Sequence, residues 1–193
     1  MKIAKYIEKG NNTMSKSILV ISSSPRKGGN SDILCDEFIK GAIAAGNKAE
    51  KIFLRDKTIH YCTGCGVCNM TKNTECSLKD DMNEILDKMM ISDVIVFATP
   101  IYFYSMSGQM KTFIDRMCSR YPHIINKEFY YILTAADNSH AAIQHALGEF
   151  RGLMSCLKNP LEKGCLFAGG VWQKGDILNT EYPKKAYELG HSV

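Results

Sequence analysis

A dense set of polar side chains follows the apolar run Ile18–Ile21 in this chain of 193 residues. Hydroxyl, amide and guanidinium groups are typical phosphate ligands, and the segment holds several of them: Ser22, Ser24, Arg26, Asn30 and Ser31. Gly28 and Gly29 let the backbone turn and expose its N–H groups, and a helix beginning after them would point its positive end at the same spot. The segment therefore predicts a phosphate cradle. The alternative is an ordinary solvated loop in which Asn30 or Ser31 caps the helix.

Three aromatic residues stand in the loop after a second apolar run, Asp93–Ala98. The loop has the sequence Thr99-Pro100-Ile101-Tyr102-Phe103-Tyr104-Ser105-Met106-Ser107-Gly108. Aromatic rings exposed there can stack on a planar ligand, or they can pack beneath the loop or across a subunit interface. A phosphate cradle and an aromatic shelf together indicate a nucleotide-like ligand with a flat ring.

Four of the eight cysteines fall within fifteen residues, spaced Cys62-x2-Cys65-x2-Cys68-x7-Cys76. Three thiolates at this overlapping spacing can hold three corners of a [4Fe–4S] cluster, and the fourth completes it. Zinc is an alternative to the iron–sulfur cluster. Structural zinc sites usually have two separated Cys-x2-Cys pairs, which this chain lacks, so the spacing favours zinc less. Metal-free thiols and a redox disulfide are further alternatives. His60, beside this segment, is expected on the surface.

The remaining composition narrows the classes of function. The net charge is +4, with no cluster of basic and aromatic residues, so we expect no nucleic-acid partner. We also expect no membrane partner, because no apolar run approaches 18 residues. Residues 1–14 are polar and lack the apolar core of a secretory signal, which favours a cytoplasmic protein. The other four cysteines are expected as small core residues: Cys35, Cys118, Cys156 and Cys165.

The elements that must position these groups alternate along the chain. Apolar runs predict five strands, over Ser17–Ser22, Lys48–Leu54, Asp93–Ala98, Phe129–Thr134 and Gly164–Ala168. Helical spacing predicts five helices, over Ser31–Ala45, Asp80–Met90, Ser107–Arg120, Ser139–Leu157 and Pro183–Leu189. Alternation of this kind predicts an open parallel sheet with helices on both faces. Residues 22–31, 99–107 and 134–140 should then converge at the carboxyl edge of the sheet.

Two motifs resemble a known family. They are Ser-Ser-Pro-Arg-Lys-Gly-Gly-Asn-Ser after the first strand and Thr-Pro-Ile-Tyr-Phe-Tyr-Ser-Met-Ser-Gly-Gln-Met-Lys-Thr-Phe-Ile-Asp-Arg at 99–116. Both are similar to segments of the NAD(P)H-dependent FMN reductases, in the flavodoxin-like superfamily that includes the iron–sulfur flavoproteins. The resemblance covers roughly residues 16–176. It implies an α/β, flavodoxin-like, three-layer doubly wound sandwich with a five-stranded parallel sheet of order 2-1-3-4-5.

The resemblance also assigns roles to residues. The FMN phosphate would be held by Ser22, Ser24, Arg26, Asn30 and Ser31, and the isoalloxazine would be contacted by Pro100, Ile101, Tyr102, Phe103 and Tyr104. A third loop would add Thr134, Ala135 and Asp137, although the family usually has glycine there and alanine leaves less room. Asp137 would disfavour an anionic reduced ring. Lys111, Asp115 and Arg116 would be structural or interface residues, and Cys62, Cys65, Cys68 and Cys76 would hold the cluster.

The implied function is an oxidoreductase. Hydride would pass from NAD(P)H through FMN to a quinone, nitro or azo compound, flavin or protein, and the flavin N5 would need no catalytic side chain. The alternative is an iron–sulfur flavoprotein that carries electrons. A kinase or phosphatase loop lacks its required residues here. We expect an arm over 1–15, a single FMN-binding domain over 16–193 with a cysteine loop at 60–79, and a homodimer or homotetramer.

Overall fold

Five parallel strands form the centre of the molecule. The structure is a computed structural model that describes residues 15–70 and 76–193, so the predicted arm lies outside the described residues except for its last position. The sheet order is β2-β1-β3-β5-β6, and the two-residue β4 pairs antiparallel with β3. The strands are β1 (Ser17–Ser22), β2 (Lys48–Phe53), β3 (Val94–Tyr102), β4 (Ser105–Met106), β5 (Glu128–Thr134) and β6 (Leu161–Ala168). Counted without β4, this is the predicted order 2-1-3-4-5.

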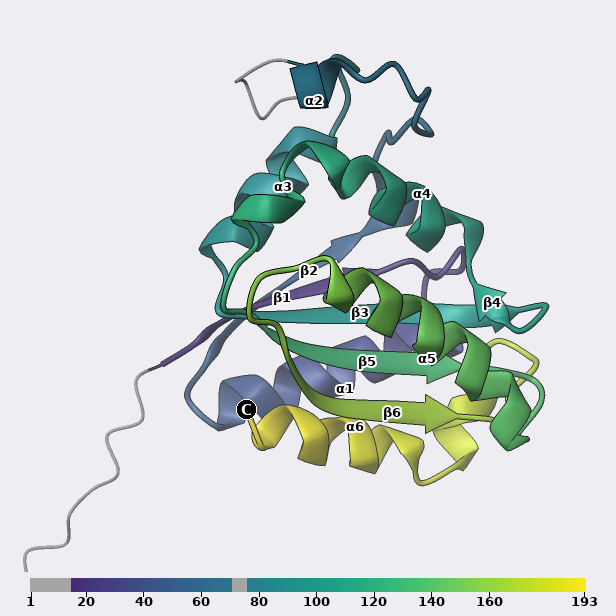
Figure 1. The fold of residues 1–193 in the computed structure, drawn as a ribbon. Coiled ribbons are helices and arrows are strands. Elements are labelled where there is room, and N and C mark those ends of the chain that lie inside the picture. The colour runs from purple at the N-terminus through teal and green to yellow at the C-terminus, as the bar shows by residue number, and fades with distance from the viewer. Residues whose placement is uncertain (1–14, 71–75) are drawn as a thin grey trace, which may run out of the picture.

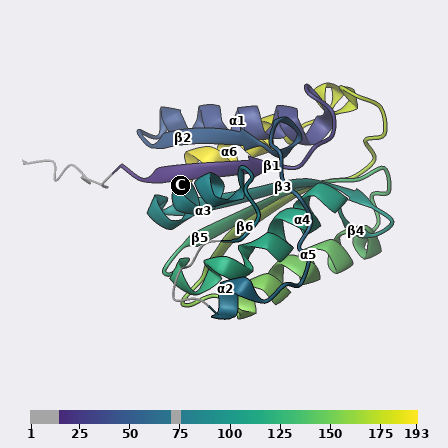
Figure 2. The ribbon, with the colours of Figure 1, turned by 90° about the horizontal axis from the view of Figure 1, so that it is seen from above.

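Helices cover both faces of this sheet (Figures 1 and 2). One layer holds α1 and α6, and the other holds α3, α4 and α5, which gives the predicted three layers. The helices are α1 (Asn30–Ala44), α2 (Val67–Met70), α3 (Met82–Ile91), α4 (Gly108–Arg116), α5 (His140–Ser155) and α6 (Tyr182–His191). Short 3-10 turns lie at η1 (Leu54–Asp56), η2 (Met117–Ser119), η3 (Tyr121–His123) and η4 (Asp176–Asn179). None of the described helices is long and apolar enough to cross a membrane.

The core consists of two apolar layers, one on each side of the sheet. β1 and β3 are almost wholly buried because helices cover both of their faces, which is why their sequences are continuous apolar runs. On the α3–α4–α5 side, Phe97 of β3 stacks on Phe150 of α5 with ring centroids 5.5 Å apart, and Tyr131 of β5 stacks on the same ring at 5.0 Å. This packing fixes the strand ends that carry the polar loops.

The expectation that the third strand ends at Ala98, before Pro100, is wrong. β3 continues to Tyr102, and Pro100 is paired with Thr134 of β5. Proline is tolerated because the pairing of β3 with β1 stops at Ala98, opposite Ser22. At Thr99 and Pro100 β3 pairs with β5 alone. Ala98 bonds toward β1, and Pro100, two residues on, faces that same side, where β1 has ended, so its missing N–H interrupts no ladder.

Candidate functional site

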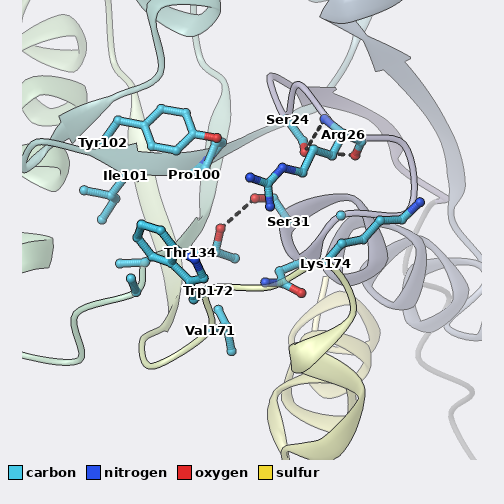
Figure 3. A pocket seen from close by; sticks show the side chains of 14 residues that line it. Ser24, Arg26, Ser31, Pro100, Ile101, Tyr102, Thr134, Val171, Trp172 and Lys174 are labelled. Carbon is cyan, nitrogen blue, oxygen red and sulfur yellow. Dashed lines mark hydrogen bonds between the residues drawn. The ribbon is translucent and has the colours of Figure 1, made fainter.

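A cleft opens at the carboxyl ends of the parallel strands, where a switch in strand order places ligand sites in folds of this class. Counted with the open solvent at its mouth, it has a volume of about 620 Å³. The loops after β1, β3, β5 and β6 all contribute to it (Figure 3). The lining residues are Ser24, Arg26, Gly29, Asn30, Ser31, Pro100, Ile101, Tyr102, Thr134, Ala135, Ala136, Val171, Trp172 and Lys174. Nine of the thirteen residues predicted to bind cofactor are therefore brought together in one cleft.

Buried hydroxyl groups join the first two predicted loops. The hydroxyl of Ser107, at the start of α4, lies 2.8 Å from that of Ser23, and Ser23 donates to the carbonyl of Ala98 at 3.1 Å. The N–H of Ser107 donates to the Thr99 hydroxyl at 3.0 Å. Because these groups are buried and satisfy one another, they hold the loops after β1 and β3 in a fixed relation.

The third loop is tied to the first in the same way. The Ser31 and Thr134 hydroxyls lie 2.7 Å apart, and both residues are buried at the floor of the cleft (Figure 3). Ala135, by contrast, donates its N–H to Ala168 at 3.0 Å and accepts from Val171 at 3.0 Å. Both backbone polar groups of Ala135 already have partners, so Ala135 can make only apolar contacts with a ligand, through its methyl group.

Positive charge gathers at the first loop. The guanidinium of Arg26 extends into the cleft toward Pro100 (Figure 3). Among the residues that the structure describes, neither Arg26 nor Lys174 has an ion-pair partner. The N-terminus of α1 faces the same place without a side-chain cap. Asp32, in the first turn of that helix, is paired with Lys51 at 2.6 Å, so its charge is neutralised. Two free cations and a helix N-terminus form an anion site.

Sequence reasoning missed the loop after β6, which places Val171, Trp172 and Lys174 in the cleft. The Asn30 side chain holds this loop: it donates to the carbonyl of Gln173 at 2.9 Å and accepts from the N–H of Gly175 at 3.0 Å. Asn30 thus lines the cleft as predicted, but its amide is used to position the loop. The signal was available, because the loop follows the end of a predicted parallel strand and holds the one tryptophan of the chain.

Ser22 is the predicted phosphate ligand that the structure leaves out of the cleft. It is the last residue of β1 and fully buried, with its hydroxyl beside the thiol of Cys35 on α1. Regular strand backbone would put Ser22 and Ser24 on one face, but β1 ends at Ser22, so Ser24 lies in the turn that follows and lines the cleft while Ser22 faces α1. Ser24 instead makes a turn with Arg26, accepting its N–H at 3.2 Å.

The predicted aromatic shelf is a tight hairpin between β3 and β4. Ile101 pairs with Met106 and Tyr102 with Ser105, which leaves Phe103 and Tyr104 as the two turn residues. Their φ angles are 49° and 63°, a left-handed conformation that normally favours glycine or asparagine. The Phe103 ring is completely exposed.

A second, more apolar chamber adjoins the cleft at this hairpin. It is lined by Ile101, Tyr102, Phe103, Tyr104, Ala135, Ala136, Asp137, Ala142 and Trp172. The Asp137 carboxylate accepts the N–H and hydroxyl of Ser139 at 2.8 and 2.9 Å. These bonds hold the pKa of Asp137 below its usual value, so the chamber carries one negative charge at neutral pH.

The described residues of the cysteine loop, 60–70 and 76–79, lie over α3 and α4, on one face of the sheet (Figure 1). Cys62 and Cys65 are exposed, and Cys68 and Cys76 are half-buried. The N–H of Val67 and the hydroxyl of Ser77 lower the pKa of the Cys65 thiol. Within residues 15–70 and 76–193, no three His, Cys, Asp or Glu side chains are arranged to hold a metal ion, so the thiols would have to converge around one.

The expectation that the other four cysteines are core residues is right for Cys35, which is buried, and wrong for Cys118 and Cys156, which are exposed; Cys165 is half-buried. Cys118 stands on η2, where α4 has ended and the chain turns outward, and its thiol lies against that of Cys68. Cys156 follows the end of α5. Both sit just past a helix terminus, where the apolar periodicity no longer determines burial.

Comparison with known proteins assigns the family. The family model of the NADPH-dependent FMN reductases matches residues 17–157. The chain belongs to this family. Among its relatives is an iron–sulfur flavoprotein of Archaeoglobus fulgidus, 32% identical over 166 residues, with the alignment covering 80% of each chain. A second iron–sulfur flavoprotein of that organism is 43% identical over 97 residues, which is 50% of this chain but only 43% of the relative.

The fold is shared with solved structures at lower identity. The NAD(P)H:quinone oxidoreductase from Methanothermobacter marburgensis superimposes with a TM-score of 0.76 over 93% of this chain and 96% of its own, at 13% identity. The segment matched to the FMN reductase family ends before β6 and α6. Val171, Trp172 and Lys174 therefore belong to the part of the cleft that the family model does not cover.

Proposed function

We propose that this protein binds FMN in the cleft and uses it as an NAD(P)H-dependent oxidoreductase. The acceptor would be a quinone, a nitro or azo compound, a flavin or a protein. One observation carries the proposal: a single cleft joins an anion site made of Arg26, Lys174 and the start of α1 to an apolar, aromatic wall. A mononucleotide with a flat ring has this same division between a charged and an apolar end.

The residues of the cleft fit the parts of FMN. The guanidinium of Arg26 would bind two phosphate oxygens, and the hydroxyls of Ser24 and Ser31 would donate to them. Tyr102 and Trp172 come from opposite loops and would bracket the ring system (Figure 3). Gly29 is required here, since a Cβ on it would lie 2.9 Å from the carbonyl oxygen of Arg26.

Bound FMN would supply the chemistry, taking a hydride from NAD(P)H and passing reducing equivalents to the acceptor. The chain's part is to bind and orient the partners. The open chamber beside Tyr104 would receive NAD(P)H and the acceptor in turn. The negative charge of Asp137 there would oppose a second negative charge on the ring and favour neutral or cationic acceptors.

Trp172 allows a direct test because it is the one tryptophan in the chain and lines the cleft. FMN binding should quench its fluorescence, and NADH or NADPH should then bleach the flavin absorbance. In Arg26→Ala the dissociation constant for FMN should rise about tenfold to a hundredfold, the value of a lost charge-assisted bond. Lys27→Ala is the matched control, since Lys27 does not line the cleft and pairs with Asp56. Equal FMN affinity in both variants would count against the cleft.

A second candidate function is electron transfer between proteins, with a [4Fe–4S] cluster on Cys62, Cys65, Cys68 and Cys76. The four thiols of the cysteine loop support it, because they supply the donor set of such a cluster. FMN that is reduced by ferredoxin but not by NADH or NADPH would favour the carrier. In either case Cys65→Ser should remove cluster absorbance while FMN remains bound.

We further propose that residues 16–193 act as one FMN-binding domain, that the protein is cytoplasmic, and that it forms a homodimer or homotetramer. The exposed rings of Phe103 and Trp172 support an assembly, since large apolar side chains at a site rim are often covered by a partner. Light scattering after gel filtration measures the mass directly.

A further inference from the structure

A buried ion pair closes the cysteine loop where it meets the body of the protein. The two Nη atoms of Arg116, the last residue of α4, donate to the two carboxylate oxygens of Asp80 at 2.6 and 2.9 Å. Their side chains are only 1% and 0% exposed. Arg116 also donates to the carbonyl of His60 at 2.6 Å, and the N–H of His60 donates to Asp80 at 3.0 Å. The guanidinium of Arg116 therefore bonds to both ends of the loop: to His60, its first residue, and to Asp80, the residue after its last.

Not all of this guanidinium is used. The Nε atom of Arg116 is buried and has no hydrogen-bond partner among the residues that the structure describes, although a buried N–H without one is costly. The side chain of Cys76 lies beside the same guanidinium. A buried cation with a spare donor therefore stands next to one of the four thiols of the loop.

The end of α4 also supports the middle of the loop. The short helix α2 packs against η2, and Cys68 in α2 lies against Cys118 in η2. Arg116 and Cys118 are two residues apart, so a single turn of chain contacts the loop at its ends and near its centre. In the described part of the chain, the exposed Lys111 and Asp115 on the same helix bond to each other and not to the loop.

We propose that Arg116 is the positioning residue of the four-thiol loop: with Asp80 it holds the loop ends together, and it places its positive charge beside Cys76. The inference rests on the second candidate function, in which these thiols hold a cluster. A loop with fixed ends loses less conformational freedom when its thiols converge. A cation and N–H donors near the sulfur atoms favour the more negative, reduced state of a cluster.

Hydrogen exchange on the cluster-free protein tests the positioning role. In Arg116→Gln and Asp80→Asn, amide exchange over residues 57–66 and 76–81 should rise at least tenfold, while β3 and β5 stay protected. Arg116→Lys, which keeps the charge but not the fork, should give an intermediate rise. Asp115→Asn is the control and should change nothing. Unchanged exchange in the loop would overturn the proposal, because the Arg116–Asp80 pair would then have no effect on the loop. An equal rise in β3 and β5 would also overturn it, because the pair would then stabilise the whole domain.

Anaerobic reconstitution with ferrous iron and sulfide tests the role of the charge. Arg116→Gln should retain several-fold less iron per chain than the wild type, and its cluster should have a more negative reduction potential. Arg116→Lys should keep the wild-type potential. A potential unmoved by Arg116→Gln would refute the role of the charge. Wild-type protein that takes up no iron would refute the cluster function itself, and the exchange experiment would still decide whether the pair positions the loop.

Discussion

At the scale of single residues, the cysteines divide into two chemical groups. Burial raises the pKa of the Cys35 thiol to about 12, and burial has the same effect on Cys165, to about 12. Cys62, Cys65, Cys118 and Cys156 are exposed. Since the thiolate is the reactive form, the first group should be inert near neutral pH and the second should react.

Alkylation with iodoacetamide at pH 8, read by mass spectrometry, should reveal this division. Cys118 and Cys156 should be modified in the native protein, whereas Cys35 and Cys165 should react about a thousandfold more slowly, given the thiolate fraction left by their raised pKa. Raising the pH to 10 should still leave Cys35 largely in the thiol form. Denaturant is the control, because it should make all of them react alike. Native labelling of Cys35 as fast as Cys156 would contradict its burial.

Residue types predicted most of the candidate site but not the partners of each side chain. Arg26 and Tyr102 line the cleft as predicted, because a guanidinium binds phosphate and an aromatic ring stacks on a flat ligand whatever the local backbone conformation. The use of the Asn30 amide depends on a contact with Gln173, 143 positions away, which no local pattern encodes. Ser22 was misplaced because its hydroxyl suits a phosphate, whereas at the end of β1 the side chain is buried beside Cys35 of α1, a contact that no local pattern encodes.

At the scale of elements, the hairpin between β3 and β4 carries backbone strain at the mouth of the site. Two aromatic residues occupy its turn with positive φ, at roughly 1–2 kcal/mol each. Strain of this kind persists where function selects the side chain over the backbone preference. The rings of Phe103 and Tyr104 line the chamber beside the cleft, which is the gain that offsets the strain.

Replacing Tyr104 separates these two effects. Tyr104→Gly should raise the free energy of unfolding by about 1 kcal/mol and the melting temperature by about 2–4 °C, because glycine adopts positive φ freely. Turnover of aromatic acceptors should fall, since the ring is gone. Tyr104→Ala is the matched control: it loses the ring but keeps a Cβ, so activity should fall without the gain in stability. If both variants melt alike, the turn is not strained.

The order and type of elements followed from the sequence because the apolar runs of β1 and β3 and the helical stripes between them are long and regular. The ends of the elements depend on single residues and on pairing between strands. The hairpin was missed because Phe103 and Tyr104 are poor turn residues, and β3 was ended too early because Pro100 is excluded only from strands with two neighbours. The turn α2 lies within the cysteine loop, where no apolar period marks it.

At the scale of the whole molecule, the last helix joins the C-terminal part of the chain to the site. α6 crosses α1 so closely that a Cβ on Gly41 would lie 2.0 Å from the carbonyl oxygen of Tyr187, and one on Gly190 would lie 2.0 Å from that of Phe38. α1 begins at the anion site, and the loop of Trp172 and Lys174 leads toward α6. The crossing of the two helices therefore sets how this loop meets the cleft.

Enlarging either glycine should affect both stability and FMN binding. Gly190→Ala forces α1 and α6 apart, so the free energy of unfolding should fall by about 1–3 kcal/mol, the usual cost of overpacking. FMN affinity should also fall several-fold, because Lys174 and Trp172 move with the displaced helix.

Gly148→Ala is the control, since Gly148 lies in the exposed middle of α5 with open space around it, and alanine there should stabilise by about 0.5–1 kcal/mol. Urea unfolding followed by circular dichroism and FMN titration followed by Trp172 fluorescence measure the two effects. A destabilised Gly190→Ala protein that binds FMN as tightly as the wild type would show that the helix crossing supports the fold without positioning the site.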